Sequence, residues 1–531
     1  MPTLSTAATS FPDLGTKVAA ARHPIYDLLQ EEWIKLGHVR EGTGGFKDGT
    51  YLVAHPREWE DHSSENPVKP GKKLKARRKI ARYENLASAI LEAKKSSLFR
   101  EQPNRRMGDG QSDEPGELEQ WWDDVDGKGT HIDDAIPAWW DLAATFGHVV
   151  LYFELPSLKP ADGETETAAD QAWPYVRVYT PLDVLNWLTD DNGQIISIKV
   201  VEAVQATTYS ELKPVTQYRV RVIDETGWKL YDFKNGKAIS QGEHQLGRLP
   251  CVFLYGKRRA ILSDVGQSVL GDPRLYIDIF NLTSELRELL RNQTFSFINL
   301  PLGTGPDAMN VETAQTMLGQ QTGTMNVLFS GGPASVLSGD AANVTAYQEE
   351  LQQTKRTIYR ETGVQWESDS KDAEAEGSLT LKREEMNTRL AAYADECQQA
   401  EYGLVDCWYR WKHGADAGPK TQEDDEVTIH YPERFSATPF DEVLQQVQAA
   451  QSVGMPALFL KELRKSLVTK FEGMANLTPD MIDKIMDAID AAPDDPTPAE
   501  RMKQRMEIMD KAVKQGGKPP AIPSDPSKAA A

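Results

Sequence analysis

The stretch between residues 121 and 134 contains the residue types that could bind a divalent cation. Two tryptophans are followed by a group of acidic residues and one histidine: Asp123, Asp124, Asp126, His131, Asp133 and Asp134. The segment DVDGKG lacks the spaced oxygen ligands and the final glutamate of a calcium loop. Aspartates also stabilise the positive end of a helix dipole. We favour a solvated helix start, and a metal-dependent nuclease or phosphatase remains the enzymatic alternative.

Short catalytic motifs are missing from the rest of the sequence. It contains no HExxH, no CxxC pair, no GxSxG and no GxxxxGK[ST]. The glycine-rich segment GTGGFKDG has no strand-like run before it, which favours a plain loop over a phosphate cradle. Cys251, Cys397 and Cys407 are too widely separated for a disulfide framework or a metal site. We therefore expect no enzymatic activity and no cofactor.

A run of basic residues after position 71 is the strongest local charge feature. It comprises Lys72, Lys73, Lys75, Arg77, Arg78, Lys79 and Arg82. This density exceeds what solubility requires in an acidic chain, so contact with DNA phosphates or with an acidic neighbour is the functional interpretation. We favour the other interpretation, a solvated helix face.

Composition limits the class of protein. The chain has 531 residues, a formal net charge of -21, 40% hydrophobic and 26% charged residues, values typical of folded proteins. No apolar run is long enough to span a bilayer, and the N-terminus lacks the pattern of a secretory signal, so we expect synthesis in a cytoplasm and no membrane contact. The negative charge disfavours a broad grip on nucleic acid, but it is compatible with a wall that DNA slides past.

The first half of the chain favours helices followed by antiparallel strands. Periodicity and capping residues predict a helix from Pro24 to Lys35, another in Lys72–Arg106 that ends before Pro103, and a helix followed by a strand within Asp123–Phe153. Alternating runs separated by Asn-Gly and Thr-Gly turns predict strands at Tyr175–Tyr179, Ile195–Val204, Gln217–Ile223, Trp228–Phe233 and Cys251–Tyr255.

The second half favours long helices. An amphipathic helix is predicted from Asp272 to Phe297. A turn-rich excursion, Asn299–Asp340, follows, with a short helix at Val311–Leu318 and a strand at Met325–Phe329. The same periodicity returns from Val344 to Gly363, and a polar break precedes the longest helix, about Leu379 to Lys412. The strand VTIHY and three helices follow, at Phe440–Ser452, Ala457–Phe471 and near Pro479–Ala491, and the composition of the tail favours disorder.

This order of parts from GRLPCVFLYGKR to FDEVLQQVQAAQSVGMPALFLKEL resembles the portal proteins of tailed bacteriophages, in the branch described as a portal-like domain of unknown function. The resemblance implies an α+β portal fold with a β-rich wing, a two-helix stem, a clip, a long wing helix and a helical C-terminal crown, assembled as a ring. It implies these regions: 1–255, N-terminal segment and wing; 256–298, first stem helix; 299–340, clip; 341–363, second stem helix; 364–377, tunnel loop; 378–472, long wing helix and wing closure; 473–531, crown and tail.

The resemblance also implies a role and partners. Members form twelve-subunit rings at one capsid vertex of the virion, through which double-stranded DNA is packaged and ejected. Terminase and a head-tail adaptor dock on the ring, which also contacts the major capsid or scaffold protein. A head-completion or tail adaptor ring is the alternative structural role.

Three groups of residues are expected to carry these contacts. A thin subunit cannot bury both apolar stripes of a helical hairpin, so we expect stem packing between subunits through Leu275, Ile279, Leu282 and Leu286. The clip residues expected to dock partners are Val311, Glu312, Gln315 and Leu318. The tunnel-loop residues expected to meet DNA are Trp366, Glu367, Asp369, Lys371 and Asp372, where Lys371 is the one basic residue.

Overall fold

The structure is a computed structural model that divides into two compact units, residues 1–435 and 436–531. In the first unit it describes residues 22–55, 58, 71–107, 116–155, 173–206, 215–244, 246–259, 264–294, 297–301, 326–330, 335–337, 341–364, 376–416, 427–432 and 435. In the second it describes short stretches between 449 and 491, all of them helical and within the three helices predicted there. The clip helix, residues 365–375 of the tunnel loop and the tail therefore lie outside the described residues, and the last two tunnel-loop residues belong to a helix.

The N-terminal part of the first unit is helical. Helix α2 (Pro24–Glu41) begins with proline at its first turn and ends at Gly42, whose φ of 64° is left-handed. The short α3 (Gly45–Asp48), α4 (Lys72–Ile80) and α5 (Leu86–Leu98) follow. The prediction of one continuous helix in Lys72–Arg106 is wrong, because Asn85 caps a new helix by accepting a hydrogen bond from the Ser88 amide.

Two further helices precede the sheets. Helix α6 (Glu117–Asp123) and helix α7 (Ile132–Phe146) are separated by the DVDGKG turn, and α7 ends at Gly147. Strand β1 (Asn104–Met107) pairs antiparallel with β13 (Val427–His430), so segments more than 300 residues apart share a two-stranded sheet.

Two antiparallel sheets contain most of the predicted strands. The first has the order β3-β2-β9, formed by β2 (His148–Glu154), β3 (Tyr175–Tyr179) and β9 (Cys251–Tyr255). The second is a meander of β4 (Val184–Thr189), β5 (Ile195–Ala206), β6 (Val215–Asp224), β7 (Gly227–Asp232) and β8 (Ala238–Glu243). The chain is thus a mixed helix and sheet protein, as the sequence predicts.

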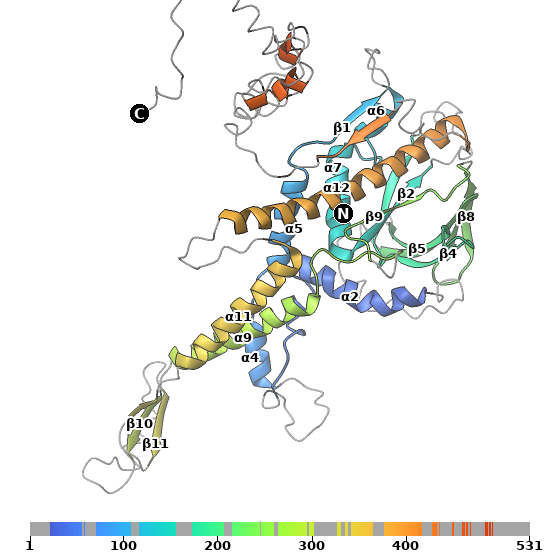
Figure 1. The fold of residues 1–531 in the computed structure, drawn as a ribbon. Helices are drawn as coiled ribbons and strands as arrows, with labels where there is room; N and C mark the ends of the chain where they lie inside the picture. The colour runs from blue at the N-terminus through green and yellow to red at the C-terminus, as the bar shows by residue number, and fades with distance from the viewer. Residues whose placement is uncertain are drawn as a thin grey trace, which may run out of the picture. The chain divides into compact units, whose positions relative to one another are not determined.

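The helices after β9 are long. Helix α9 (Pro273–Thr294) and helix α11 (Ala341–Thr362) flank a small sheet in the chain, and helix α12 (Glu376–His413) follows (Figure 1). In the small sheet β10 (Phe297–Pro301) pairs parallel with β11 (Asn326–Ser330) and antiparallel with β12 (Ser335–Leu337). The predicted first helix was therefore slightly too long, because α9 ends at Thr294 and Phe297 already belongs to β10.

The main hydrophobic core joins helices and the first sheet. Helices α7 and α12 both pack against β9, and α5 packs against both helices. The largest completely buried side chains include Trp33, Trp121 and Trp140. None of the helices in the described part of the chain is both long and apolar enough to cross a membrane.

Candidate functional site: the helical hairpin and the basic helix

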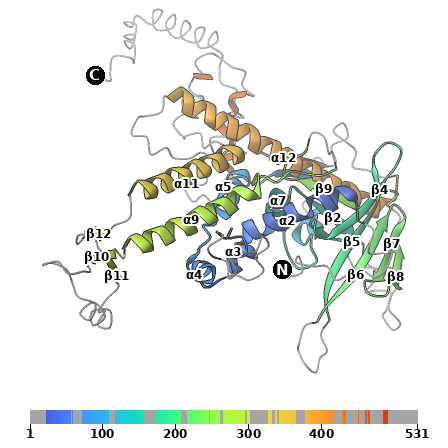
Figure 2. The same ribbon diagram turned by 90° about the horizontal axis from the view of Figure 1, so that it is seen from below.

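Helices α9 and α11 form an antiparallel hairpin. Figures 1 and 2 show them side by side. The Glu361 carboxylate lies beside Gly271 just before α9, whereas Tyr347 donates a hydrogen bond to Glu285 at 3.2 Å further along α9. The start of α9 thus lies beside the end of α11, and a later part of α9 lies beside the beginning of α11. The two helices are therefore antiparallel.

The apolar stripe of α9 is buried at its N-terminal part and half-buried further along. Ile279 is 1% exposed and belongs to the main core, together with Ile358 of α11 at 1%. Leu275 is half-buried against the same core, and Leu282 and Leu286 are half-buried. Ile279 is therefore covered by its own chain, whereas Leu275, Leu282 and Leu286 each keep part of their surface accessible.

Arg77 joins the basic helix α4 to α9. It is 3% exposed, and its Nε and Nη2 atoms each lie 2.8 Å from an oxygen of Glu58. Its guanidinium also lies 3.7 Å from Glu285 and 3.9 Å from Glu288 on α9. The prediction that Arg77 belongs to a basic contact surface is wrong, because the side chain points inward and compensates the buried Glu58 carboxylate.

The other six predicted basic residues are more exposed than Arg77. Lys72, Lys73, Lys75, Lys79 and Arg82 are exposed, and Arg78 is half-buried. In the described part of the chain none of those five exposed side chains has an ion pair or a hydrogen bond. We define the α4 lysine face as Lys72, Lys73, Lys75 and Lys79.

The aspartates after Trp122 hold the turn between α6 and α7. Asp124 accepts hydrogen bonds from the backbone amides of Lys128 and Gly129 at 2.9 and 2.8 Å. Asp126 accepts from the Thr130 hydroxyl at 3.0 Å. Their carboxylates thus cap the turn, and among the described residues no group of three or more His, Cys, Asp or Glu side chains is placed to hold a metal ion.

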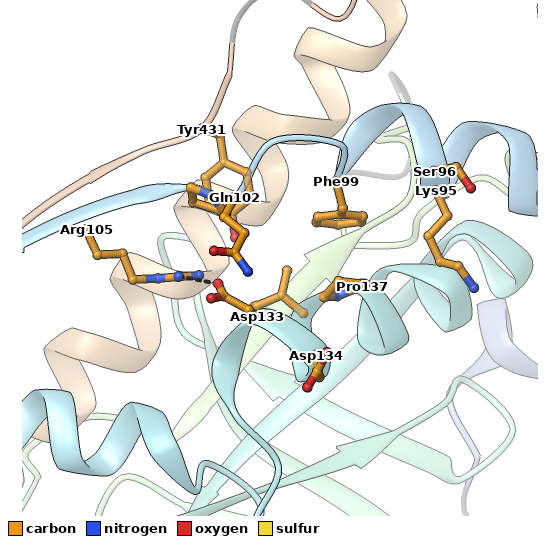
Figure 3. Close-up of a pocket in the computed structure, with 11 residues that line it drawn as sticks. Lys95, Ser96, Phe99, Gln102, Arg105, Asp133, Asp134, Pro137 and Tyr431 are labelled. Carbon is orange, nitrogen blue, oxygen red and sulfur yellow. Dashed lines mark hydrogen bonds and ion pairs between the residues drawn. The ribbon is translucent and has the colours of Figure 1, made fainter. Parts of the chain in front are cut away.

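A hollow of about 330 Å³ lies where α5, β1 and α7 meet (Figure 3). Arg105 faces Asp133 across it and also binds Glu401 of α12. Although burial alone lowers the pKa of Arg105, the Glu401 and Asp133 carboxylates raise it above its usual value. Arg105 is therefore compensated by Asp133 of α7 and Glu401 of α12, and this pairing holds β1 between the two helices.

Sequence reasoning missed Glu401. It is completely buried on α12, between Cys397 and Leu404 of the apolar stripe. A carboxylate at a stripe position was the available signal, because a buried charge requires a partner. The partner, Arg105, lies 296 residues away, which no local pattern reveals.

The three cysteines occupy packing positions. Cys251, Cys397 and Cys407 are buried free thiols, as expected from their spacing. Burial raises the pKa of each thiol above its usual value, in the case of Cys407 to about 12. These thiols are inert at neutral pH because the thiolate is the reactive form.

The remaining predicted contact residues lie outside the described residues. They are the clip residues Val311, Glu312, Gln315 and Leu318 and the tunnel-loop residues Trp366, Glu367, Asp369, Lys371 and Asp372.

Comparison with known proteins gave matches to solved structures. No protein-family model and no curated protein matches the chain. A chain from the neck of an empty gene transfer agent particle is 10% identical with a TM-score of 0.42, over 74% of this chain and 93% of that chain. A chain from the virion of a native gene transfer agent particle is 10% identical with a TM-score of 0.34, over 75% of this chain and 88% of that chain.

Proposed function

We propose that this chain is the portal protein of a phage-like particle. It forms a ring at one capsid vertex, through which double-stranded DNA is packaged and ejected, and on which terminase and a head-tail adaptor dock. The observation that carries the proposal is the antiparallel hairpin of α9 and α11, which leaves Leu282 and Leu286 half-buried.

A second copy of the chain would bury the surface that Leu282 and Leu286 leave accessible. Beyond them Leu290 is 42% exposed, so apolar surface continues along the helix. Burying such surface contributes about 25 cal/mol per Å². A head-to-tail contact between copies covers the stripe on every subunit only when the ring closes.

The negative net charge of the chain is compatible with a channel through which DNA passes. A ring of subunits that each carry a net charge of -21 does not hold DNA phosphates over a broad surface. DNA can then move through the channel while a few cations guide it. The aspartates of the α6–α7 turn, which the nuclease alternative would require as metal ligands, accept backbone hydrogen bonds instead.

Ring formation is tested with one charge on the stripe. Leu282→Asp should give folded monomers, because an unpaired carboxylate buried at the subunit contact costs several kcal/mol. Leu28→Asp is the matched control, since Leu28 is 79% exposed on α2. Mass photometry should show rings, twelve subunits being expected, for the parent and for Leu28→Asp, and electron microscopy should show a central channel. Monomers of the parent chain at all concentrations would refute the proposal.

We also propose that residues 299–340 form the docking surface for terminase and adaptor. Glu312 and Gln315 lie in the turn-rich segment between the two hairpin helices, where binding loops commonly occur. Glu312→Lys and Gln315→Arg should reduce DNA packaging and tail attachment in particles while ring assembly persists. Normal packaging and attachment in both variants would disprove the docking role.

A further inference from the structure

The α4 lysine face is a continuous cationic surface on one side of a short helix. Lys72, Lys75 and Lys79 are spaced by three and four residues, which aligns them along the helix. The opposite side carries the buried Leu74 and Arg77, so α4 is fixed to the chain by its inner side alone. The neighbouring carboxylates Glu58, Glu285 and Glu288 face Arg77, which leaves the outer lysines without an anion among the described residues.

This arrangement opposes the stability of the helix itself. The first turn of α4 has no acidic residue and begins with two lysines, which face the positive end of the helix dipole. Like charges three and four residues apart repel one another by about 0.2–0.5 kcal/mol per pair. A bound polyanion removes both penalties, so the lysine face is better suited to a charged partner than to solvent alone.

The composition of the face favours a nucleic acid backbone over a protein surface. Protein interfaces are depleted in lysine and depend on aromatic, Met or Arg side chains at their centres. The exposed side of α4 offers lysines and Ala76, with no aromatic or large apolar side chain. Lysine is a flexible point charge that does not demand one bidentate geometry. Such cations suit phosphates that pass in any sequence and register.

We propose that the α4 lysine face binds the phosphate backbone of double-stranded DNA and is the principal DNA contact in residues 71–107. The inference rests on the proposed function in one respect, because the conduit supplies the DNA. It adds the location of the contact and its sequence-independent character.

The test compares two triple variants with equal changes of charge. In one, Lys72, Lys75 and Lys79 are replaced by glutamine; in the other, Lys229, Lys234 and Lys237, which are exposed around β7, are replaced in the same way. Binding of a fluorescent 30-base-pair duplex of arbitrary sequence is measured by anisotropy from about 25 to 200 mM salt. We expect the α4 variant to bind at least tenfold more weakly at the lowest salt. The slope of log K against log salt should become shallower by about 0.9 for each phosphate that the variant no longer neutralises.

Four outcomes would overturn the inference. Equal losses in both triple variants would mean that general charge, and not α4, controls binding. Unchanged DNA binding by the α4 variant, or no binding by the parent chain, would also overturn it, and failed ring assembly with normal DNA binding would identify the face as a protein contact. If the parent chain forms no rings but the α4 variant still loses DNA binding, the portal proposal fails and this one stands.

Discussion

Arg77 on α4 and Glu58 form a bidentate ion pair inside the chain, with both donor-acceptor distances at 2.8 Å. Arg77 Nη2 also donates to the Val53 carbonyl, and the Val53 amide donates to Asn281 on α9. One guanidinium therefore connects α4, the segment around Val53 and the hairpin. The position of the lysine face depends on this buried contact.

Replacing Arg77 by methionine should destabilise the first unit by about 3–5 kcal/mol, because Glu58 would remain buried without its cation. Arg77→Lys should recover only part of this loss, since an ammonium cannot donate to both oxygens in the same planar geometry. The measurement is the urea midpoint of tryptophan fluorescence, and all twelve tryptophans lie within residues 1–435. The exposed Lys79→Met is the control and should not lower the midpoint. A similar midpoint for Arg77→Met would contradict the prediction.

Arg221 joins the two antiparallel sheets. Its Nε donates to Glu202 at 2.6 Å within the second sheet, and its Nη1 donates to Glu154 of β2 at 3.2 Å. The guanidinium also lies 4.7 Å from the centre of the Trp228 ring. Although burial raises the pKa of Glu202, the Arg221 charge brings it below the usual range.

Arg221→Met should therefore destabilise the first unit by about 3–5 kcal/mol at pH 7. The loss should shrink as the pH falls, because protonation of Glu202 removes the uncompensated charge. The double variant Arg221→Met, Glu202→Gln should be more stable than Arg221→Met alone. Urea unfolding at pH 7 and pH 5 checks both statements, and additive effects of the two substitutions would show that the residues act independently.

The elements that the sequence predicts well are those with a strong internal pattern. Strands β2 and β9 are continuous apolar runs, β3 alternates, and helices α11 and α12 are long and amphipathic. The observed bounds of all five lie within a few residues of the prediction. Strand β8 has no such pattern, because all but one of its side chains are exposed and its register comes from pairing with β7.

The errors at α4 come from tertiary contacts. The break between α4 and α5 is stabilised by hydrogen bonds from Tyr83 and Asn85 to carbonyl groups of α2. The inward position of Arg77 depends on Glu58 and on α9, over 200 residues later. The spacing of Leu74 and Arg77 on one side of α4 was the local signal, but only the partners identify Arg77 as buried.

Deleting residues 365–375 tests the prediction that a tunnel loop in this part of the sequence meets DNA. The segment is acidic and contains Lys371 as its one basic residue, so we expect weak, brief contact with passing phosphates. Particles with the deletion should assemble rings but lose packaged DNA, and Lys371→Gln alone should have a smaller effect. DNA content per particle, measured by quantitative PCR after nuclease treatment, gives the result. Normal DNA content in the deletion would reject a role in DNA retention.

Lys94 of α5 is a buried cation that faces α12. It is 1% exposed, and its Nζ lies 5.5 Å from the centre of the Tyr393 ring. Burial, together with the nearby Arg389 charge, lowers the pKa of Lys94 from 10.5 to about 8. Lys94 is therefore protonated at pH 7 in both the folded and the unfolded chain, and the folded chain carries the full cost of burying the charge.

Lys94→Met should stabilise the first unit at pH 7 by about 1–3 kcal/mol, because methionine fills a similar volume without a charge. Stability of the parent should rise with pH between about 8 and 10.5, where the folded chain has released the proton and the unfolded chain still holds it. The advantage of Lys94→Met should therefore shrink across that window. Lys95→Met is the matched control, since the neighbouring Lys95 pairs with Glu92 and is only partly buried. The urea midpoints of both variants and the parent, measured at pH 7, 9 and 10.5, test this prediction. If Lys94→Met were less stable than the parent at pH 7, the Lys94 ammonium would have an anionic partner in the folded chain.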